Sequence, residues 1–366
     1  MEGLVEMMRQ KPERFYKGKR VLVTGHTGFK GGWLSLWLLK FGAQVTGYAL
    51  KPAPGPNFFN ILNLRNHMHS VTGDIRDKKK LQLFFKDFKP EIVIHMAAQS
   101  LVRQSYQDPI MTYETNVMGT VNVLNICREF SGVRAIVNVT SDKCYENQGK
   151  NKSYKETDSM GGFDPYSSSK GCAELVTTAY QKSFFAKEKY NKDHRAAIAS
   201  ARAGNVIGGG DWNKDRLIPD CIRVIFGKEN LVIRYPNAIR PWQYVLEPLY
   251  GYLLLAMRLY EDGPTFSGPW NFGPGKKNEK TVKWILEKFK ESWDGFSWEI
   301  EVQPQPHESA SLRLNSYKAE SLLGWHPKLG LVKALKETVQ WYQAWHDKVD
   351  MNALSLNQIK NYMQDI

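Results

Sequence analysis

The sequence predicts an α/β protein with a Rossmann-type, doubly wound parallel sheet and a smaller mixed α/β substrate domain. Three observations predict it. Short β-branched segments alternate with amphipathic segments in the first half of the chain, as parallel sheets require. A glycine-rich turn joins the first β-branched segment to a helical one, which is typical of dinucleotide-binding folds. After about residue 205 the alternation stops, and glycine, proline and tryptophan become frequent.

Six segments have the length and composition of buried strands. They are Arg20–Thr24, Gln44–Tyr48, His69–Val71, Glu91–Met96, Ala135–Thr140 and Ala196–Ala201. The stretch Trp33–Phe41 places its tryptophans and leucines on one helical face, and Gly42 follows as a C-cap. A later helix is expected over Tyr244–Tyr260. We expect that helix to return to the first domain.

The 366 residues are enough for two domains. We predict an NAD-binding domain over residues 17–204, joined by about 241–268. The substrate domain then comprises residues 205–240 and 269–366.

The net charge of +13 comes from 50 Lys and Arg against 37 Asp and Glu. Nucleic-acid binding requires the basic residues to gather in one patch or stripe. Here they are scattered, and the only tight run is Lys78–Lys80. The charge therefore favours phosphorylated small molecules as partners and argues against nucleic acid.

The four cysteines have no C-x-x-C spacing, so we expect reduced thiols and no metal site. The stretch Met1–Lys19 is polar and lacks the apolar core of a signal peptide. The longest apolar stretch, Leu253–Met257, is too short to span a bilayer. These features predict a soluble cytoplasmic protein that does not contact membranes.

The glycine-rich turn has G-x-x-G-x-x-G spacing between the first strand and its helix. Glycines permit a tight turn and a close approach to a pyrophosphate, and the helix N-terminus supplies free N–H groups. The residues expected to hold the cofactor in this turn are Gly25, Thr27, Gly28, Phe29, Lys30 and Gly31. The carboxylate that usually holds the adenosine ribose is missing, and Lys51 stands there, which leaves NADP open. Asp74 and Ile75, at the next strand end, are expected beside the adenine.

The catalytic pair is predicted at the start of a helix. Asp164 is expected as the N-cap and Pro165 as the first helical residue. Tyr166 and Lys170 are then four residues apart on one face. The ammonium is expected to lower the phenol pKa, so that Tyr166 removes a sugar hydroxyl proton. Ser141, at a strand end, is expected to hydrogen-bond that hydroxyl.

Together these residues and their order resemble the extended short-chain dehydrogenase/reductase family. The resemblance implies an active tetrad of Asn116, Ser141, Tyr166 and Lys170, with NAD as cofactor. It also implies that the segment Ala97, Ala98 and Gln99 contacts the cofactor.

Longer motifs, within about Lys17–Pro327, resemble the nucleotide-sugar 4,6-dehydratases that act on CDP-glucose. This resemblance implies CDP-glucose as substrate and a step toward the deoxysugars of lipopolysaccharide O-antigen. It further implies a homodimer or homotetramer, because family members commonly pair through a helix bundle.

Dehydration requires an acid and a base beside the tetrad, which epimerisation does not. Asp142 and Lys143 follow Ser141 directly. In related hexose dehydratases this pair is Asp-Glu, and the resemblance implies that Asp142 protonates the leaving C6 hydroxyl. The C5 base stays open between Lys143 with a lowered pKa, Tyr166 and a water. A structural ion pair of Asp142 with Lys143 is the alternative.

On the substrate side, arginines suit the diphosphate. The resemblance implies substrate contacts at Asn205, Arg216 and Arg240, and further contacts at His307 and Glu308. The alternative functions are an NAD-dependent nucleotide-sugar 4-epimerase, a 4,6-dehydratase of another nucleoside diphosphate glucose, and a non-catalytic dinucleotide sensor. The intact Tyr166–Lys170 pair argues against the sensor.

Overall fold

The computed structural model describes residues 11–147, 152–227, 231–233, 235–293, 296–300 and 312–364. Its centre is a seven-stranded sheet, parallel throughout, in the order β3-β2-β1-β4-β5-β7-β12. The strands are β1 (Arg20–Thr24), β2 (Gln44–Ala49), β3 (His69–Thr72), β4 (Ile92–His95), β5 (Ala135–Val139), β7 (Ala197–Arg202) and β12 (Gly268–Asn271). The predicted Rossmann-type sheet and its six expected strands are confirmed.

Successive residues of each central strand enter two different hydrophobic cores. In β1, Leu22 packs into one core and Val21 and Val23 into the other. Val93 of β4 and Ile136 of β5 pack into the same core as Leu22. Because side chains alternate across a strand and both faces of this sheet are covered, almost every strand position is apolar.

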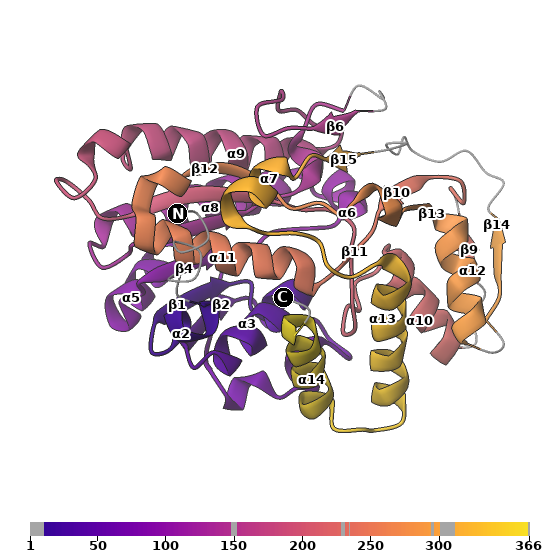
Figure 1. The fold of residues 1–366 in the computed structure, drawn as a ribbon. Helices are drawn as coiled ribbons and strands as arrows, with labels where there is room; N and C mark the ends of the chain where they lie inside the picture. Colours follow the sequence, from indigo (N-terminus) through magenta and orange to yellow (C-terminus); the bar gives the residue numbers. More distant parts are fainter. Residues whose placement is uncertain are drawn as a thin grey trace, which may run out of the picture.

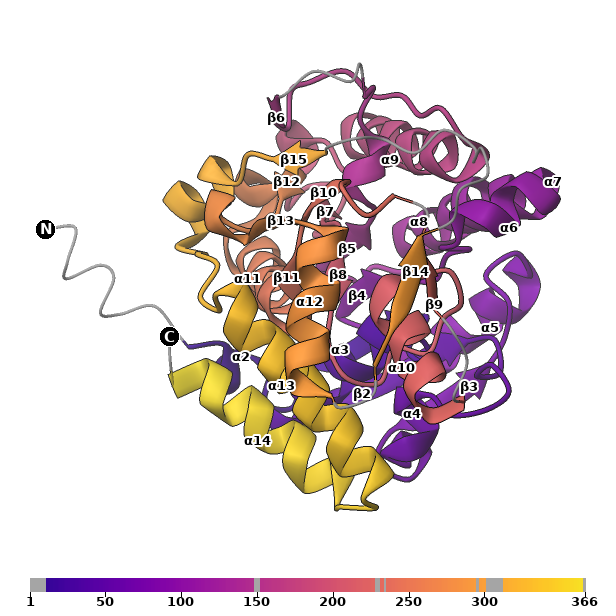
Figure 2. The same ribbon diagram turned by 90° about the vertical axis from the view of Figure 1, so that its right-hand side faces the viewer.

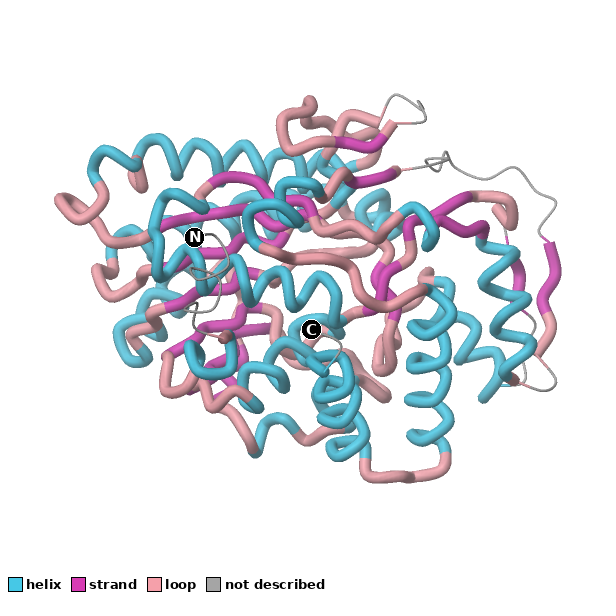
Figure 3. Tube along the Cα trace, viewed as in Figure 1, coloured by secondary structure: helices cyan, strands magenta, loops and turns pink. Residues whose placement is uncertain are grey.

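Helices cover both faces of the sheet (Figures 1 and 3). The first core includes residues of α2 (Pro12–Tyr16), α3 (Phe29–Lys40) and α11 (Leu246–Asp262). The second includes residues of α5 (Lys78–Phe88) and α8 (Gly119–Glu129), and α9 (Pro165–Ser183) packs beside α8 and β7. The predicted return of the later helix is confirmed, since α11 contacts β5 and β7.

The seventh strand extends the central sheet beyond residue 268, where the sequence analysis places a domain boundary. β12 pairs with β7 along its whole length, from Gly268 beside Ala199 to Asn271 beside Arg202. The strand thus belongs to the central sheet. Its sequence, Gly-Pro-Trp-Asn, lacks the β-branched residues that mark strands, and Pro269 is tolerated because β12 is an edge strand.

The remaining elements gather largely beyond the carboxyl ends of the strands (Figure 2). Four small two-stranded sheets pair β10 with β13, β11 with β8, β14 with β9 and β15 with β6. The bounds of these strands are β6 (Ser153–Tyr154), β8 (Val206–Ile207), β9 (Leu231–Ile233), β10 (Ile239–Pro241), β11 (Gln243–Tyr244), β13 (Glu279–Thr281), β14 (Trp298–Ile300) and β15 (Arg313–Leu314).

The other helices are mostly short. They are α4 (Phe58–Ile61), α6 (Val102–Gln107), α7 (Pro109–Tyr113), α10 (Leu217–Gly227), α12 (Val282–Ser292), α13 (Leu331–His346) and α14 (Met351–Gln364). The 3-10 turn η3 (Asp142–Cys144) and the π-helical turn η2 (Glu114–Met118) complete the elements near the site.

The last helix ties the end of the chain to its beginning. α14 packs on α3, and Asn352 Nδ2 donates to the Leu62 carbonyl at 3.0 Å. Tyr362 donates to Glu247 of α11 at 2.8 Å. No helix among the described residues is both long and apolar enough to cross a membrane. All four cysteines are free thiols.

Candidate active site

The glycine-rich turn forms a tight cradle at the carboxyl end of β1. Gly25 has a φ of 76°, which favours glycine. A Cβ on Gly25 would lie 2.8 Å from the backbone nitrogen of Ala97, and one on Gly31 would lie 2.2 Å from the Gly25 carbonyl oxygen. Gly28 caps α3 without a side chain. The α3 N-terminus is therefore exposed to a ligand through backbone alone, which fits a pyrophosphate.

The other predicted cofactor residues line the neighbouring strand ends. Thr27 Oγ1 donates to the Leu50 carbonyl at 3.1 Å and ties the turn to the end of β2. Asp74 is paired with Arg76 at 2.7 Å. Burial raises the pKa of Asp74, but hydrogen bonds and charge from Arg76 outweigh burial and hold that pKa below its ordinary value. Lys51 is exposed where a ribose-binding acid is usual.

Asn116 joins the segment after β4 to the catalytic helix. Its amide accepts from the Gln99 backbone N–H at 2.8 Å and donates to the Gln99 carbonyl at 2.9 Å. It also donates to Ser169 of α9 at 2.8 Å. Asn116 lies in the π-helical turn η2, an irregularity frequent at functional sites. These contacts suit a residue that positions the segment of Ala97, Ala98 and Gln99.

The N-terminus of α9 has the predicted cap. Asp164 accepts from the Ser167 backbone N–H at 2.9 Å, and Pro165 is the first helical residue. Tyr166 and Lys170 are both buried. Burial lowers the pKa of Lys170 to about 8, although the charge of Glu174 raises it.

The expected lowering of the phenol pKa is wrong for this structure. Burial raises the pKa of Tyr166 to about 12, and its hydrogen bond with Ser141 offsets this only in part. Asp142 adds a further upward shift. Without additional positive charge beside it, Tyr166 is therefore protonated at neutral pH.

Ser141 and Asp142 turn away from the end of β5 into the site. Ser141 Oγ donates to Asp142 Oδ1 at 3.0 Å and accepts from the Lys143 backbone N–H at 3.2 Å. The Asp142 carboxylate is buried against Gly204, where a Cβ would lie 1.9 Å from Oδ2. Lys143 is half-buried. Within the described residues, Lys143 and Asp142 form no ion pair, so the structural ion-pair interpretation is wrong for this structure.

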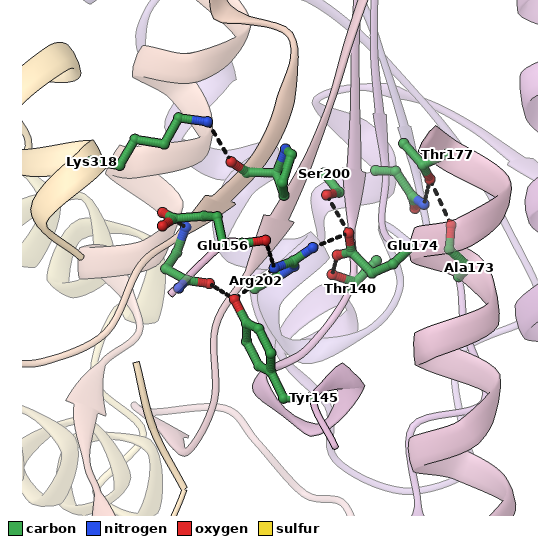
Figure 4. A network of polar contacts seen from close by, with 12 residues as sticks. Thr140, Tyr145, Glu156, Ala173, Glu174, Thr177, Ser200, Arg202 and Lys318 are labelled. Carbon is green, nitrogen blue, oxygen red and sulfur yellow. Dashed lines mark hydrogen bonds and ion pairs between the residues drawn. The ribbon is translucent and has the colours of Figure 1, made fainter. Parts of the chain in front are cut away.

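A buried polar network, which the sequence analysis missed, fixes the catalytic helix to the sheet (Figure 4). Glu174 of α9 accepts from Ser200 at 2.6 Å and from the Arg202 guanidinium at 2.7 Å. It also accepts from Thr140, the residue before Ser141. Arg202 in turn donates to Tyr145 at 2.6 Å. The network thus fixes the position of α9, which contains Tyr166 and Lys170, relative to the segment that contains Ser141 and Asp142.

The predicted substrate residues are only partly brought together. Arg216, just before α10, donates to Asp211 at 3.0 Å and to Ser100 at 3.2 Å. Its charge lowers the pKa of Tyr166, so the two side chains are near each other. Asn205 has a φ of 44°, a strained conformation that clusters at functional sites. Arg240 lies on β10, where it donates to the Ile239 carbonyl at 3.1 Å.

The remaining two substrate residues, His307 and Glu308, lie outside the described part of the chain.

Lys30, which the sequence predicts as a cofactor residue, and Tyr252, which the sequence analysis missed, lie near the catalytic cluster. Lys30 Nζ lies 5.9 Å from the ring centroid of Tyr252 on α11. Charges of Asp142 and Tyr166 raise the pKa of Tyr252, after the larger effect of burial. Tyr252 lies in a leucine-rich helix, so the sequence alone indicates a core residue. An aromatic polar group among aliphatic neighbours is the only signal that could have found it.

Comparison with known proteins places these features in context. A family model described as GDP-mannose 4,6 dehydratase matches residues 22–338. A CDP-glucose 4,6-dehydratase of Salmonella typhimurium is 52% identical over 352 residues, covering 96% of this chain and 98% of that protein. A UDP-glucose 4-epimerase of Halalkalibacterium halodurans is 28% identical over 89% of this chain and 95% of its own.

Among solved structures, a dTDP-glucose 4,6-dehydratase from Streptomyces venezuelae with NAD and TYD bound shares the fold. Its TM-score is 0.77 at 24% identity, with 91% of this chain and 99% of that chain covered.

Proposed function

This chain belongs to the GDP-mannose 4,6 dehydratase family, and we propose that it converts CDP-D-glucose to CDP-4-keto-6-deoxy-D-glucose and water. The observation that carries the proposal is the 52% identity, over nearly the whole chain, to a CDP-glucose 4,6-dehydratase. The site supports it, since the buried acid Asp142 accompanies Ser141 and Tyr166.

The glycine cradle and the α3 N-terminus are suited to hold the NAD pyrophosphate through backbone N–H groups. Bound there, NAD would supply reversible hydride transfer, away from C4 of the sugar and back to C6. Thr27 and Gln99 are proposed at the two sides of the cofactor, with Tyr166 and Lys170 at its reactive end. Asp74 is proposed to lie beside the adenine. Its carboxylate already forms an ion pair with Arg76, so the adenine would meet the pair and not a free carboxylate.

The side chains of the protein are proposed to remove and donate the protons of the reaction. Tyr166 is the proposed base for the C4 hydroxyl proton. Because burial raises its pKa, the positive charge of a bound nicotinamide, together with the buried Lys170, would have to favour the phenolate. Ser141 orients the hydroxyl by hydrogen bonding. Once C4 is a ketone, the C5 hydrogen becomes acidic. A base removes it while Asp142 protonates the C6 oxygen, and water leaves.

The buried position of Asp142 suits an acid. Its carboxyl group accepts a hydrogen bond from Ser141, the residue proposed to orient the sugar hydroxyl. A 4-epimerase has no leaving hydroxyl to protonate. The placement of Asp142 next to Ser141 and Tyr166 therefore favours dehydration.

The diphosphate of the substrate is assigned to Arg216, and Arg240 is assigned to the nucleotide. Asn205 is proposed to contact the sugar side, and His307 and Glu308 the nucleoside. The residues 205–240 and 269–366, apart from β12, are proposed to form the substrate domain.

We also propose a homodimer or a homotetramer. Large apolar side chains are exposed on α6, α7 and α9, which contact one another. They are Tyr106, Ile110, Tyr113 and Leu175. An exposed apolar patch of this kind marks an association surface. A cytoplasmic location and a role in deoxysugar supply for O-antigen complete the proposal.

The test incubates purified protein with CDP-glucose and a catalytic amount of NAD and follows product mass. We expect loss of one water, formation of a 4-keto sugar, and no net change in NAD. A product of unchanged mass would instead identify an epimerase. Parallel reactions with UDP-glucose and dTDP-glucose measure the choice of nucleotide.

A further inference from the structure

Arg216, which is assigned to the substrate diphosphate, is held in place by two other side chains. Its guanidinium forms an ion pair with the Asp211 carboxylate, with 3.0 Å between Nη1 and Oδ2. The second terminal nitrogen, Nη2, donates to the Ser100 hydroxyl at 3.2 Å. The side chain of Arg216 is 34% exposed, whereas that of Asp211 is 4% exposed. A buried carboxylate therefore anchors an arginine that keeps part of its surface open to a ligand.

Asp211 is fixed by contacts that do not involve Arg216. Its Oδ1 accepts from the backbone N–H of Asn213 at 3.2 Å and from Asn213 Nδ2 at 2.6 Å. Its backbone carbonyl accepts from the buried Tyr342 hydroxyl of α13 at 2.6 Å. The next residue, Trp212, packs edge-on against Tyr342 with the ring centroids 5.3 Å apart. The position of the carboxylate is therefore set by the loop and by α13.

The turn before Asp211 is closely packed between two helices. Trp33 of α3 donates its indole N–H to the Gly209 carbonyl at 2.9 Å. A Cβ on Gly209 would lie 2.0 Å from Cγ of Trp341 on α13. Gly210 has a φ of 82°, which favours glycine. A loop held this tightly can fix a charged group at one place, as a binding site requires.

An arginine fixed in this way suits a diphosphate. A guanidinium carries five N–H donors in a planar fork, and Asp211 and Ser100 each accept from one of its nitrogens. The remaining donors can bind phosphate oxygens. A free arginine loses side-chain freedom when it binds an anion, and an arginine that is already held loses less. By its charge alone, the Asp211 carboxylate would repel a diphosphate.

We propose that Asp211 is a positioning residue, which holds the Arg216 guanidinium where it meets the diphosphate of the substrate. The inference rests on the proposed function, because that diphosphate belongs to the nucleotide sugar. Asp211 acts through Arg216 and is assigned no contact with the substrate. Tyr342, 131 positions away in sequence, supports Asp211 from α13. The C-terminal part of the chain thus contributes to nucleotide affinity from outside the site.

The test is a double-mutant cycle in the full-length protein. It compares wild type, Asp211→Asn, Arg216→Ala and the variant with both changes. Asp215→Asn is the matched control, because it removes a carboxylate from the same loop that pairs with Arg103 at 3.0 Å. Affinities for CDP and for NAD are measured by calorimetry, and kcat and KM are measured with CDP-glucose. Unchanged NAD affinity shows that each variant is folded.

We expect Asp211→Asn to bind CDP about 10-fold more weakly than wild type, the effect of one hydrogen bond between charged groups. KM for CDP-glucose should rise by a similar factor while kcat is retained. With Arg216→Ala already present, Asp211→Asn should cause no further loss, and it should improve CDP binding if the remaining carboxylate repels the diphosphate. Asp215→Asn should bind CDP as wild type does.

Three results would overturn the inference. Tighter CDP binding by Asp211→Asn would mean that the ion pair competes with the diphosphate. Equal weakening with and without Arg216 would mean a general disturbance of the loop. Unchanged CDP affinity would mean that Arg216 needs no support.

The proposed function is tested separately in the same experiment. Wild type that binds CDP but does not dehydrate CDP-glucose would remove the proposed function, and the mutant cycle would still decide the role of Asp211. Titrations with UDP and dTDP run in parallel, and the cycle is measured with the diphosphate that binds most tightly. If wild type binds none of the three, the inference is overturned.

Discussion

Replacing Glu174 with glutamine should destabilise the protein and disturb its site. Glu174 and Arg202 form an ion pair at 2.7 Å with side chains 2% and 3% exposed. Removing one partner of a buried pair costs about 3–5 kcal/mol, because the other charge stays buried. Arg202 would keep its bond to Tyr145. We therefore expect the lower end, about 3 kcal/mol.

The measurement is urea unfolding at pH 7, followed by circular dichroism. In a parallel thermal scan, about 3 kcal/mol should lower the Tm of a chain of this size by roughly 4 °C. Glu129→Gln is the matched control, since Glu129 is exposed and, within the described residues, accepts hydrogen bonds only from Gln82 and Asn125. The control should change stability by less than about 0.5 kcal/mol. A loss below about 1 kcal/mol for Glu174→Gln would refute the reasoning.

The difference between wild type and Glu174→Gln should depend on pH. Burial raises the pKa of Glu174, but Arg202, Ser200 and Thr140 outweigh burial and hold it below 4.5. A carboxylate with a depressed folded-state pKa stabilises the protein above its unfolded pKa, and that stability is lost as pH falls through the folded value. The difference should therefore be full at pH 7 and shrink below about pH 4.

Three further predictions concern the site. Tyr166→Phe should lower kcat by about 10²–10⁴-fold with an unchanged Tm, measured as CDP-glucose turnover; equal turnover would exclude Tyr166 as the base for the C4 hydroxyl. Gly204→Ala should displace Asp142, since the new Cβ would lie 1.9 Å from its carboxylate, and should slow water loss while reduced nicotinamide still forms; Gly275→Ala, which meets nothing within 4 Å, is the control. Gly31→Ala should abolish NAD binding in calorimetry, because the Cβ meets the Gly25 carbonyl at 2.2 Å; retained affinity would mean that the turn can open.

The central sheet could be predicted because its strands repeat one physical pattern. Both faces are covered, so β1, β4 and β5 are largely apolar runs separated by helices. β12 could not be found this way. Its four residues contain glycine and proline, and it pairs with β7 only because α11 first crosses the sheet. The two- and three-residue strands likewise depend on partners distant in sequence.

The candidate site was predictable where chemistry follows local spacing. Tyr166 and Lys170 share one helix face, and Ser141 and Asp142 follow one strand, so a linear pattern contains them. Tyr252 is different, since it meets Lys30 across more than two hundred residues of chain. The pKa of Tyr166 was also predicted wrongly. Sequence spacing indicates that Lys170 is near Tyr166, but not how far the phenol is removed from water. Burial is the largest influence on the pKa of Tyr166.

The contacts of α14 have a consequence for the order of folding. The bond from Asn352 to Leu62 joins residues 290 positions apart, and Tyr362 closes on α11. During synthesis, α3 and α11 would therefore keep apolar surface uncovered until almost the entire chain has been made. Contacts this distant in sequence slow folding and prolong exposure to aggregation. The packing of α3, the first long helix, is therefore complete only when α14, the last helix, has been synthesised.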